Sequence, residues 1–196
     1  MLRILFSDIK GATKSPAIFI DRDGVINRRR PGDYVLNWSQ FTFMPGIQAA
    51  LKQLATLGLP IIVISNQAAV GKGLLDRVGL EEITKHLHKA LAADGVSLAA
   101  AYYCPHRRED NCLCRKPKPA LLQSAADDFN IELSRSIFIG DSQTDVQAAR
   151  AAGCRPVLFG AGLHVCSDSP GWKADLPVAL TTQDLLQVTA KCLRGA

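Results

Sequence analysis

The fold is decided by residues 17–25, which read AIFIDRDGV. The first four are apolar and predict a short buried strand, which ends at Asp21. A second carboxylate, Asp23, follows before Gly24, a residue that tolerates the backbone conformation of a tight turn. A buried strand that ends in polar residues at such a turn is typical of parallel sheets, which bind ligands at the carboxyl ends of their strands.

The rest of the chain alternates short apolar runs with helical segments. Further buried strands are predicted at residues 60–65, 98–103, 136–140 and 156–160. Helices are predicted at residues 46–57, 79–94, 119–130, 143–152 and 183–193. This alternation predicts an α/β fold, a doubly wound parallel sheet with helices on both faces. We expect residues 17–196 to form one domain without a large cap, and residues 1–16 to be a tail or an added edge element.

Length and composition limit the classes of protein to be considered. The chain has 196 residues, of which 47% are hydrophobic and 21% charged, as expected for one folded domain. It has no apolar run of about 18 residues and no secretory signal, so we expect a cytoplasmic protein without a membrane partner. The net charge of +5 is compatible with nucleic acid or with small anionic substrates.

Polar side chains follow three of the predicted strands. They are Asp21 and Asp23, Ser65 and Asn66, and Asp141 and Asp145. An isolated polar residue after a strand is usually a turn or a helix cap, but three such groups at one sheet edge indicate a site. Converging carboxylates repel one another unless a cation such as Mg²⁺ lies between them.

A basic loop supplies groups that would bind an anion. Residues 114–119 read CRKPKP, and Arg115 and Lys116 lie just before a predicted helix. Cations near a helix N-terminus suit a phosphate group, although a solvated basic loop is the simpler alternative for this segment alone. Ser65, Asn66 and Gln67 add a hydroxyl and amide donors, so the sequence holds the parts that phosphoryl transfer requires.

Cysteine spacing predicts a second metal site. Three thiols and an imidazole fall within eleven residues, at Cys104, His106, Cys112 and Cys114. They make a full tetrahedral shell for structural zinc, against the alternative of four unrelated residues in a loop. A zinc site closed by four protein ligands would shape the loop and hold Arg115 and Lys116 toward the strand ends. The remaining cysteines, at positions 154, 166 and 192, are expected to be small core or surface residues.

Over residues 17–160 the chain resembles the haloacid dehalogenase-like phosphatase superfamily. The resemblance depends on four motifs in order, Asp21-x-Asp23, Ser65, Lys116 and Gly140-Asp141-x-x-x-Asp145. It implies that Asp21 attacks phosphorus to give an aspartyl phosphate, and that Asp23 protonates the leaving oxygen and then activates water.

The same resemblance implies the supporting groups. Mg²⁺ would be held by Asp21, Asp141 and the main-chain carbonyl of Asp23. Lys116 and Ser65 would neutralise the transferring phosphoryl group, and Asp145 would orient Lys116 or a nearby water.

Two branches of the superfamily are similar in detail, the D-glycero-D-manno-heptose 1,7-bisphosphate 7-phosphatases and the histidinol-phosphate phosphatases. Residues 25–27 (VIN), 70–73 (VGKG) and 117–119 (PKP) resemble the heptose branch, whereas the five-residue gap between His106 and Cys112 resembles the histidinol branch. In either branch Asn66, Gln67 and Arg115 would contact the substrate. Residues 28–30, three arginines, are either a gate that attracts a second phosphate or a solvated turn. We expect the heptose bisphosphate as substrate, with histidinol phosphate as the alternative.

Two other functions remain open. A zinc-containing nucleic-acid-binding module would account for the basic charge, but aromatic residues are only 6% of the chain and the three strand-end aspartates would have no purpose. A haloacid dehalogenase-like protein with a structural role is disfavoured because no catalytic position is missing. We therefore expect a monomeric enzyme that binds a small phosphorylated sugar and no nucleic acid.

Overall fold

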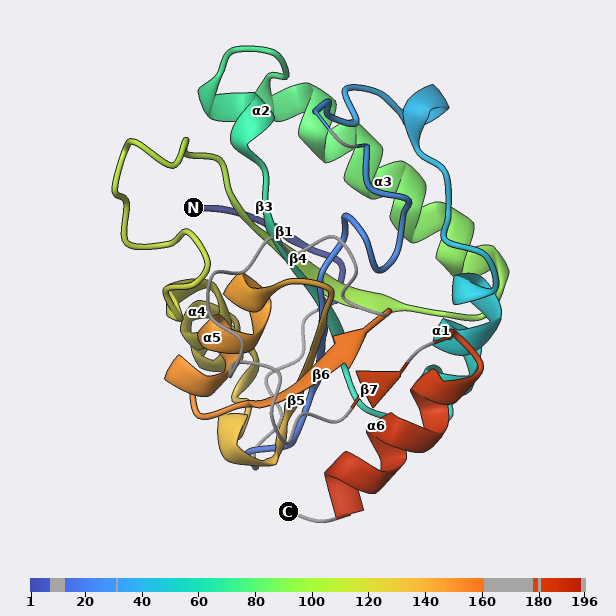
Figure 1. The fold of residues 1–196 in the computed structure, drawn as a ribbon. Helices are drawn as coiled ribbons and strands as arrows, with labels where there is room; N and C mark the ends of the chain where they lie inside the picture. Colours follow the sequence, from blue (N-terminus) through green and yellow to red (C-terminus); the bar gives the residue numbers. More distant parts are fainter. Residues whose placement is uncertain (8–12, 31, 161–177, 180, 195–196) are drawn as a thin grey trace.

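The computed structural model describes residues 1–7, 13–30, 32–160, 178–179 and 181–194, and within them a seven-stranded sheet lies between two layers of helices (Figure 1). The strands are β1 (Leu2–Leu5), β2 (Ile18–Ile20), β3 (Ile61–Asn66), β4 (Leu98–Cys104), β5 (Ile137–Gly140), β6 (Arg155–Phe159) and β7 (Val178–Ala179). Their order is β1-β4-β3-β2-β5-β6-β7, and every neighbouring pair is parallel except β1 and β4. The predicted α/β fold is confirmed.

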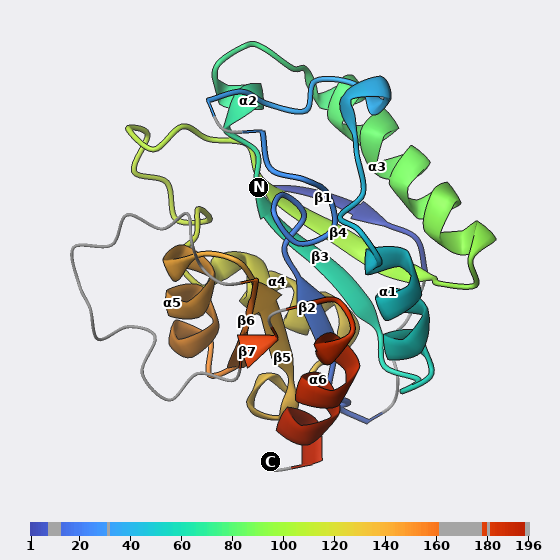
Figure 2. The ribbon, with the colours of Figure 1, turned by 45° about the vertical axis from the view of Figure 1, so that its right-hand side comes forward.

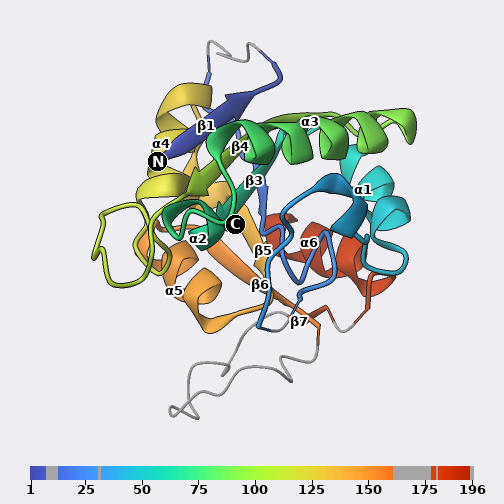
Figure 3. The same cartoon turned by 90° about the horizontal axis from the view of Figure 1, so that it is seen from above.

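The helices cover both faces of this sheet. They are α1 (Ile47–Ala55), α2 (Ala68–Gly71), α3 (Arg77–Ala93), α4 (Ala120–Phe129), α5 (Gln143–Ala151) and α6 (Asp184–Arg194), with 3-10 turns η1 (Trp38–Gln40) and η2 (Leu133–Arg135). Seen from above, α1, α3 and α6 lie on one side of the sheet and α4 and α5 on the other (Figure 3). The helix α3 begins two residues before its predicted start because Asp76 caps it, accepting a hydrogen bond from Gly79 N.

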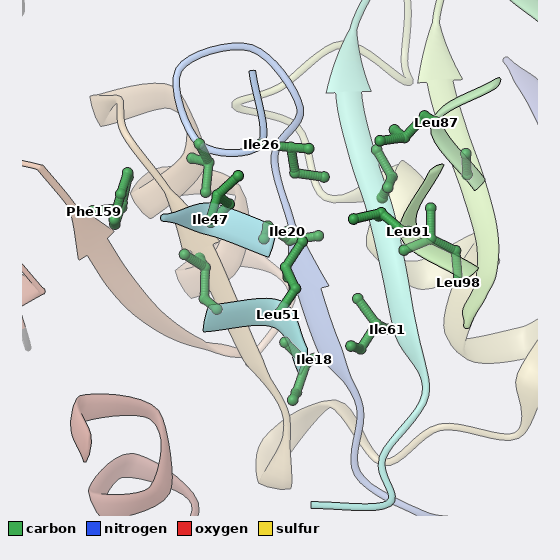
Figure 4. Packing of buried hydrophobic residues seen from close by; sticks show 14 of the residues in the cluster. Ile18, Ile20, Ile26, Ile47, Leu51, Ile61, Leu87, Leu91, Leu98 and Phe159 are labelled. Atoms are coloured by element: carbon green, nitrogen blue, oxygen red, sulfur yellow. The ribbon is translucent and has the colours of Figure 1, made fainter. Parts of the chain in front are cut away.

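Alternation along the strands divides the core into two layers. Ile18 and Ile20 pack with α1 and α3, where Ile47 and Leu51 contribute from α1 (Figure 4). Phe19, between them in sequence, points to the opposite layer with α4 and α5. Each fully buried side chain of this size stabilises the fold by about 1.5–3 kcal/mol, so the central strands are held firmly from both faces.

The register in which β2 pairs with β3 and β5 brings the polar ends of these strands together. Ile20 pairs with Val63 on one side and with Ile139 on the other, so Asp21, Ser65 and the residues after Gly140 reach the same edge of the sheet. Figure 2 shows the segments that follow the strands, α2 and the chain before α4 among them, gathered at this edge.

The structure bears on the expectations for residues 1–16, for Cys166 and for membrane-spanning helices. Residues 2–5 form the edge strand β1, antiparallel to β4, while residues 8–12 of the expected tail or edge element lie outside the described residues. Cys166 also lies outside them. Among the described residues no helix is long and apolar enough to cross a bilayer.

Candidate active site

A cavity of about 570 Å³ opens at the carboxyl ends of β2 and β3. Most of the residues predicted for the site line it, namely Asp21, Asp23, Ser65, Asn66, Gln67, Arg115, Lys116 and Asp145. The sheet thus brings together side chains that are up to 124 positions apart in sequence.

A buried lysine joins two of the aspartates. Lys116 Nζ lies 2.9 Å from Asp21 Oδ1 and 2.6 Å from Asp145 Oδ1, and all three side chains are almost inaccessible to solvent. The lysine also donates to the main-chain oxygen of Ile64 at 3.0 Å. Burial alone would lower the pKa of Lys116. The carboxylates of Asp145 and Asp21 have the larger effect and raise this pKa.

Asp145 is committed to protein groups on both of its oxygens. While Oδ1 faces Lys116, Oδ2 accepts hydrogen bonds from the main-chain N–H of Ser142 at 3.1 Å and from its hydroxyl at 2.6 Å. The Ser142 and Asp145 pair forms a capping box that begins α5. Asp145 therefore contacts Lys116 and the start of α5 at the same time.

Asp141 approaches the turn after β2 very closely. A Cβ atom on Gly24, where φ is +97°, would lie 1.9 Å from Asp141 Oδ2, so only glycine leaves room for this carboxylate. Carboxylate oxygens of Asp21, Asp141 and Asp145 lie within 4.8 Å of one another. Burial and the neighbouring carboxylates raise the pKa of Asp21 to about 6 and that of Asp141 to about 7, although Lys116 and Arg29 act in the opposite direction.

Asp23 lies in a different environment. Its carboxylate accepts from the buried Arg22 guanidinium at 2.9–3.3 Å, from Asn27 Nδ2 at 2.9 Å and from Gln67 Nε2 at 2.7 Å. Burial would raise the pKa of Asp23, but Arg22 and the two amides outweigh it and lower the pKa. The two carboxylates of the Asp21-Arg22-Asp23 motif therefore have pKa values shifted in opposite directions.

The residues after β3 bind other parts of the site in this structure. Asn66 Oδ1 accepts from Lys116 N at 3.1 Å, and Asn66 Nδ2 donates to Lys116 O at 3.2 Å, so this amide fixes the lysine loop. Gln67 Nε2 donates to Ser65 Oγ at 3.1 Å as well as to Asp23. Ser65 is 2% exposed and lines the cavity.

The predicted zinc ligands converge on one point. Cys104 Sγ lies 3.5 Å from Cys112 Sγ, which lies 3.7 Å from Cys114 Sγ. His106 Nδ1 lies 3.7 Å from the first of these sulfurs and 3.3 Å from the last. Ligands at about 2.3 Å from a tetrahedral ion are about 3.8 Å apart, so this spacing suits zinc. All three cysteines are free thiols.

The cysteine loop contacts the cavity wall. Arg115 Nη1 donates to the main-chain oxygen of His106 at 3.2 Å, which fixes the arginine beside the cluster. On the other side Gly71 N donates to Pro105 O at 2.8 Å, and a Cβ on Gly71 would lie 2.7 Å from that oxygen. The loop is therefore held between α2 and the start of α4.

Only some of the basic residues near the site line the cavity. Arg29, Arg30, Lys72, Arg115 and Lys116 do, whereas Arg28, Arg107, Arg108 and Lys118 are not among its lining residues. Sequence reasoning missed the contact of Arg29 with Asp141, at 2.7 Å, and the burial of Arg22. No local pattern indicates either one, because both depend on how the segment after β2 folds back on the sheet.

Comparisons with known proteins agree with this geometry. The family model for haloacid dehalogenase-like hydrolases matches residues 13–153. A Mycobacterium tuberculosis protein named D-glycero-alpha-D-manno-heptose-1,7-bisphosphate 7-phosphatase is 44% identical over 149 residues, which cover 73% of this chain and 78% of that protein. An Escherichia coli protein named D-glycero-beta-D-manno-heptose-1,7-bisphosphate 7-phosphatase is 34% identical over 187 residues, covering 88% and 97%.

A solved structure is similar over nearly the whole chain. It is the D,D-heptose 1,7-bisphosphate phosphatase of B. bronchiseptica, complexed with magnesium and phosphate. The TM-score is 0.79 at 31% identity, with 92% of this chain and 99% of that chain covered.

Proposed function

The chain belongs to the haloacid dehalogenase-like hydrolase family, and we propose that it is a Mg²⁺-dependent phosphatase that removes the 7-phosphate of D-glycero-D-manno-heptose 1,7-bisphosphate. The observation that carries the proposal is Asp21 at the end of β2, with Lys116 Nζ 2.9 Å away and Asp141 beside it. Relatives in several organisms bear the name of this activity and cover 69–88% of the chain.

Asp21 is the nucleophile of the proposed reaction. Its oxygen attacks the phosphorus, the sugar oxygen departs, and water then cleaves the aspartyl phosphate. Lys116, which is buried and charged, and the hydroxyl of Ser65 neutralise the oxygens of the transferring group. The ion pair with Asp145 keeps the lysine in place between turnovers.

Asp23 is the acid and base. Its lowered pKa makes it a carboxylate in the free enzyme, the state needed to activate water in the second step. As the substrate binds, the negative charge of the arriving phosphoryl group raises the proton affinity of Asp23, which takes up a proton from water. Asp23 gives this proton to the leaving oxygen and so returns to the carboxylate form for the second step. Arg22, Asn27 and Gln67 fix its position for both steps.

The donor set at the strand ends suits Mg²⁺, a hard ion bound by oxygen. Asp21, Asp141 and the main-chain carbonyl of Asp23 would hold it, and the repulsion that raises the pKa of both carboxylates would then be relieved. When bound, Mg²⁺ neutralises charge on the phosphoryl oxygens. Asp145 is not a ligand in this proposal because Lys116 and Ser142 use its oxygens.

Zinc is the proposed ion of the cysteine loop, held by Cys104, His106, Cys112 and Cys114. The four protein ligands leave no open position, so the ion shapes the loop and takes no part in the chemistry. Through the contact with His106 O it positions Arg115 at the cavity wall.

The substrate recognised by this cavity is a small sugar with two phosphates. Arg29, Arg30, Lys72 and Arg115 line the cavity. Arg29 and Arg30 pair with Asp141 and Asp33, and a second phosphate would add an anionic partner for Lys72 or Arg115. Arg115 contacts the phosphate that does not react, while Asn66 and Gln67, which line the same cavity, contact the rest of the substrate. The enzyme acts as a monomer in the cytoplasm.

Histidinol phosphate is the second candidate substrate. It is favoured by the short spacing of five residues between His106 and Cys112, which resembles the histidinol branch. A monophosphate would leave part of the basic wall without a partner, so the heptose bisphosphate is preferred.

The decisive experiment compares kcat/KM with Mg²⁺ for the α and β anomers of heptose 1,7-bisphosphate and for histidinol phosphate. A preference of at least about a hundredfold for a heptose bisphosphate is expected. A clear preference for histidinol phosphate would overturn the proposed substrate. Salt-sensitive binding of RNA without phosphate release from any of the three would instead favour a nucleic-acid-binding protein.

A further inference from the structure

Arg29 lies on the irregular segment between β2 and η1, and one of its nitrogens approaches two oxygens of the aspartate cluster. Arg29 Nη2 donates to Asp141 Oδ1 at 2.7 Å and to the main-chain oxygen of Asp23 at 3.4 Å. These residues supply two of the three ligands that the proposed function assigns to Mg²⁺. A guanidinium group therefore binds two of the residues that a divalent ion would use.

The charges around the cluster favour this position of Arg29. Lys116 pairs with Asp21 and Asp145, and Arg29 pairs with Asp141, so each carboxylate faces a cation. Burial opposes the charge of Arg29, but Asp141, Asp21 and Asp145 outweigh it and raise the arginine pKa. The side chain of Asp141 is 18% exposed and that of Arg29 is 47% exposed, so the arginine can leave toward solvent while the aspartate cannot.

We infer that Arg29 and Mg²⁺ compete for Asp141 and for the carbonyl of Asp23, so that binding of the ion releases the arginine into the cavity. Mg²⁺ requires close, nearly octahedral oxygen ligands, and two cations cannot share one carboxylate oxygen at contact distance without repulsion. The released guanidinium remains on a segment that lines the cavity, where it is available to a phosphate group. Loading of the ion and presentation of an arginine to the substrate thus become one event. The inference rests on the proposed function for the identity of the ion.

The test is titration of the EDTA-treated protein with Mg²⁺ in a calorimeter, without substrate. Removing an ion pair of this exposure is worth up to about 1 kcal/mol, so the variant Arg29→Gln should bind Mg²⁺ about fivefold more tightly than the native protein. The matched control is Arg28→Gln, which removes the same charge from an exposed neighbour that does not line the cavity, and its affinity should change less than twofold. Unchanged or weaker binding by Arg29→Gln, or an equal gain in both variants, overturns the inference.

Thermal unfolding gives a second readout that does not depend on activity. Without metal, Arg29→Gln should melt below the native protein because Asp141 loses its cation, and added Mg²⁺ should raise its Tm by more than it raises that of the native protein. Equal shifts with Mg²⁺ would contradict competition. Absence of phosphate release from heptose bisphosphates would refute the proposed function, and the Mg²⁺ titration would still decide the role of Arg29.

Discussion

Two groups of potential metal ligands lie within the described residues, and they differ in how the chain brings their members together. The aspartate cluster takes its members from the ends of two strands, at Asp21 and Asp141, and from the first turn of α5, at Asp145. The cysteine cluster takes all four members from residues 104–114. The first depends on several strands of the sheet, whereas the second depends on the end of β4 and the loop that follows it.

The two groups also differ in how the protein neutralises them. Lys116 and Arg29 supply positive charge to the aspartates, so this site is partly balanced by the chain itself. The cysteine cluster has spacing that suits an ion, and its side chains contact one another and main-chain N–H groups of the same loop. We therefore propose that the aspartate site exchanges its cation during function and that the cysteine site needs an ion for its shape.

The largest expected effect is a loss of activity without a loss of stability when Asp21 at the aspartate site is replaced. The variant Asp21→Asn should lower kcat on heptose 1,7-bisphosphate by about 10⁴-fold or more, because the nucleophile is lost. The thermal unfolding midpoint should not fall, since burial already disfavours the charge of this carboxylate. Asp127→Asn, a change of the same kind on the exposed side of α4, should leave kcat unaltered. Turnover by Asp21→Asn within a hundredfold of the native rate would remove Asp21 from the mechanism.

The variant Lys116→Met tests whether the buried ammonium group of Lys116 stabilises the aspartate site. Deleting it leaves Asp21 and Asp145 buried without their partner, so the free energy of unfolding in urea should fall by about 3–5 kcal/mol. The control Lys118→Met alters an exposed lysine two residues away and should cost about 1 kcal/mol or less. If Lys116→Met lowers the free energy of unfolding by less than about 1 kcal/mol, Lys116 does not neutralise the buried carboxylates of Asp21 and Asp145.

Stability of the metal-free protein should fall as pH rises. The pKa values of Asp21 and Asp141, about 6 and about 7, lie above the ordinary value of 3.8, so the folded state binds more protons than the unfolded state. Their contribution is present at low pH and is lost as pH rises through 6 and 7, by about 2–3 kcal/mol between about pH 5.5 and about pH 7.5. Urea unfolding at these two values measures it, and Asp141→Asn should remove most of the dependence.

Mg²⁺ provides the control for the pH experiment. At saturating Mg²⁺ the two carboxylates are bound as anions, so the fall in stability toward neutral pH should disappear. A fall of equal size with and without the ion would mean that the groups responsible lie outside the aspartate site.

The sequence predicted the parts of this protein that depend on local pattern. Short apolar runs located β2 to β6, and the polar residues after three of them marked the site edge, because a parallel sheet aligns its strand ends. The cysteine cluster was also predicted, since its members are close along the chain. These features need no knowledge of how distant segments meet.

Contacts between distant segments were not predictable in the same way. The bond between Arg29 and Asp141 joins positions 112 apart, and residues 28–30 carry no periodicity that fixes where each side chain points. The hydrogen bonds between Asn66 and the main chain of Lys116 join positions 50 apart and form only where β3 and the basic loop meet. Arg22 is a charged residue between two aspartates, and the amino-acid types around it do not indicate that it is buried. Its burial follows from the way the segment after β2 folds.

The smallest expected effect concerns the cysteine loop and tests whether its ion is only structural. The variant Cys112→Ser should lose the zinc that we propose for the native protein, one ion per chain, because a hydroxyl replaces a thiolate ligand. Arg115 is fixed through His106 O, so loosening the loop should act on substrate binding, raising KM about tenfold while kcat changes little. Cys154→Ala, which alters a buried cysteine outside the cluster, should keep zinc and native kinetics. A large fall in kcat with unchanged KM in Cys112→Ser would place the cysteine loop in the chemical step, and the contrast between the two metal sites would fail.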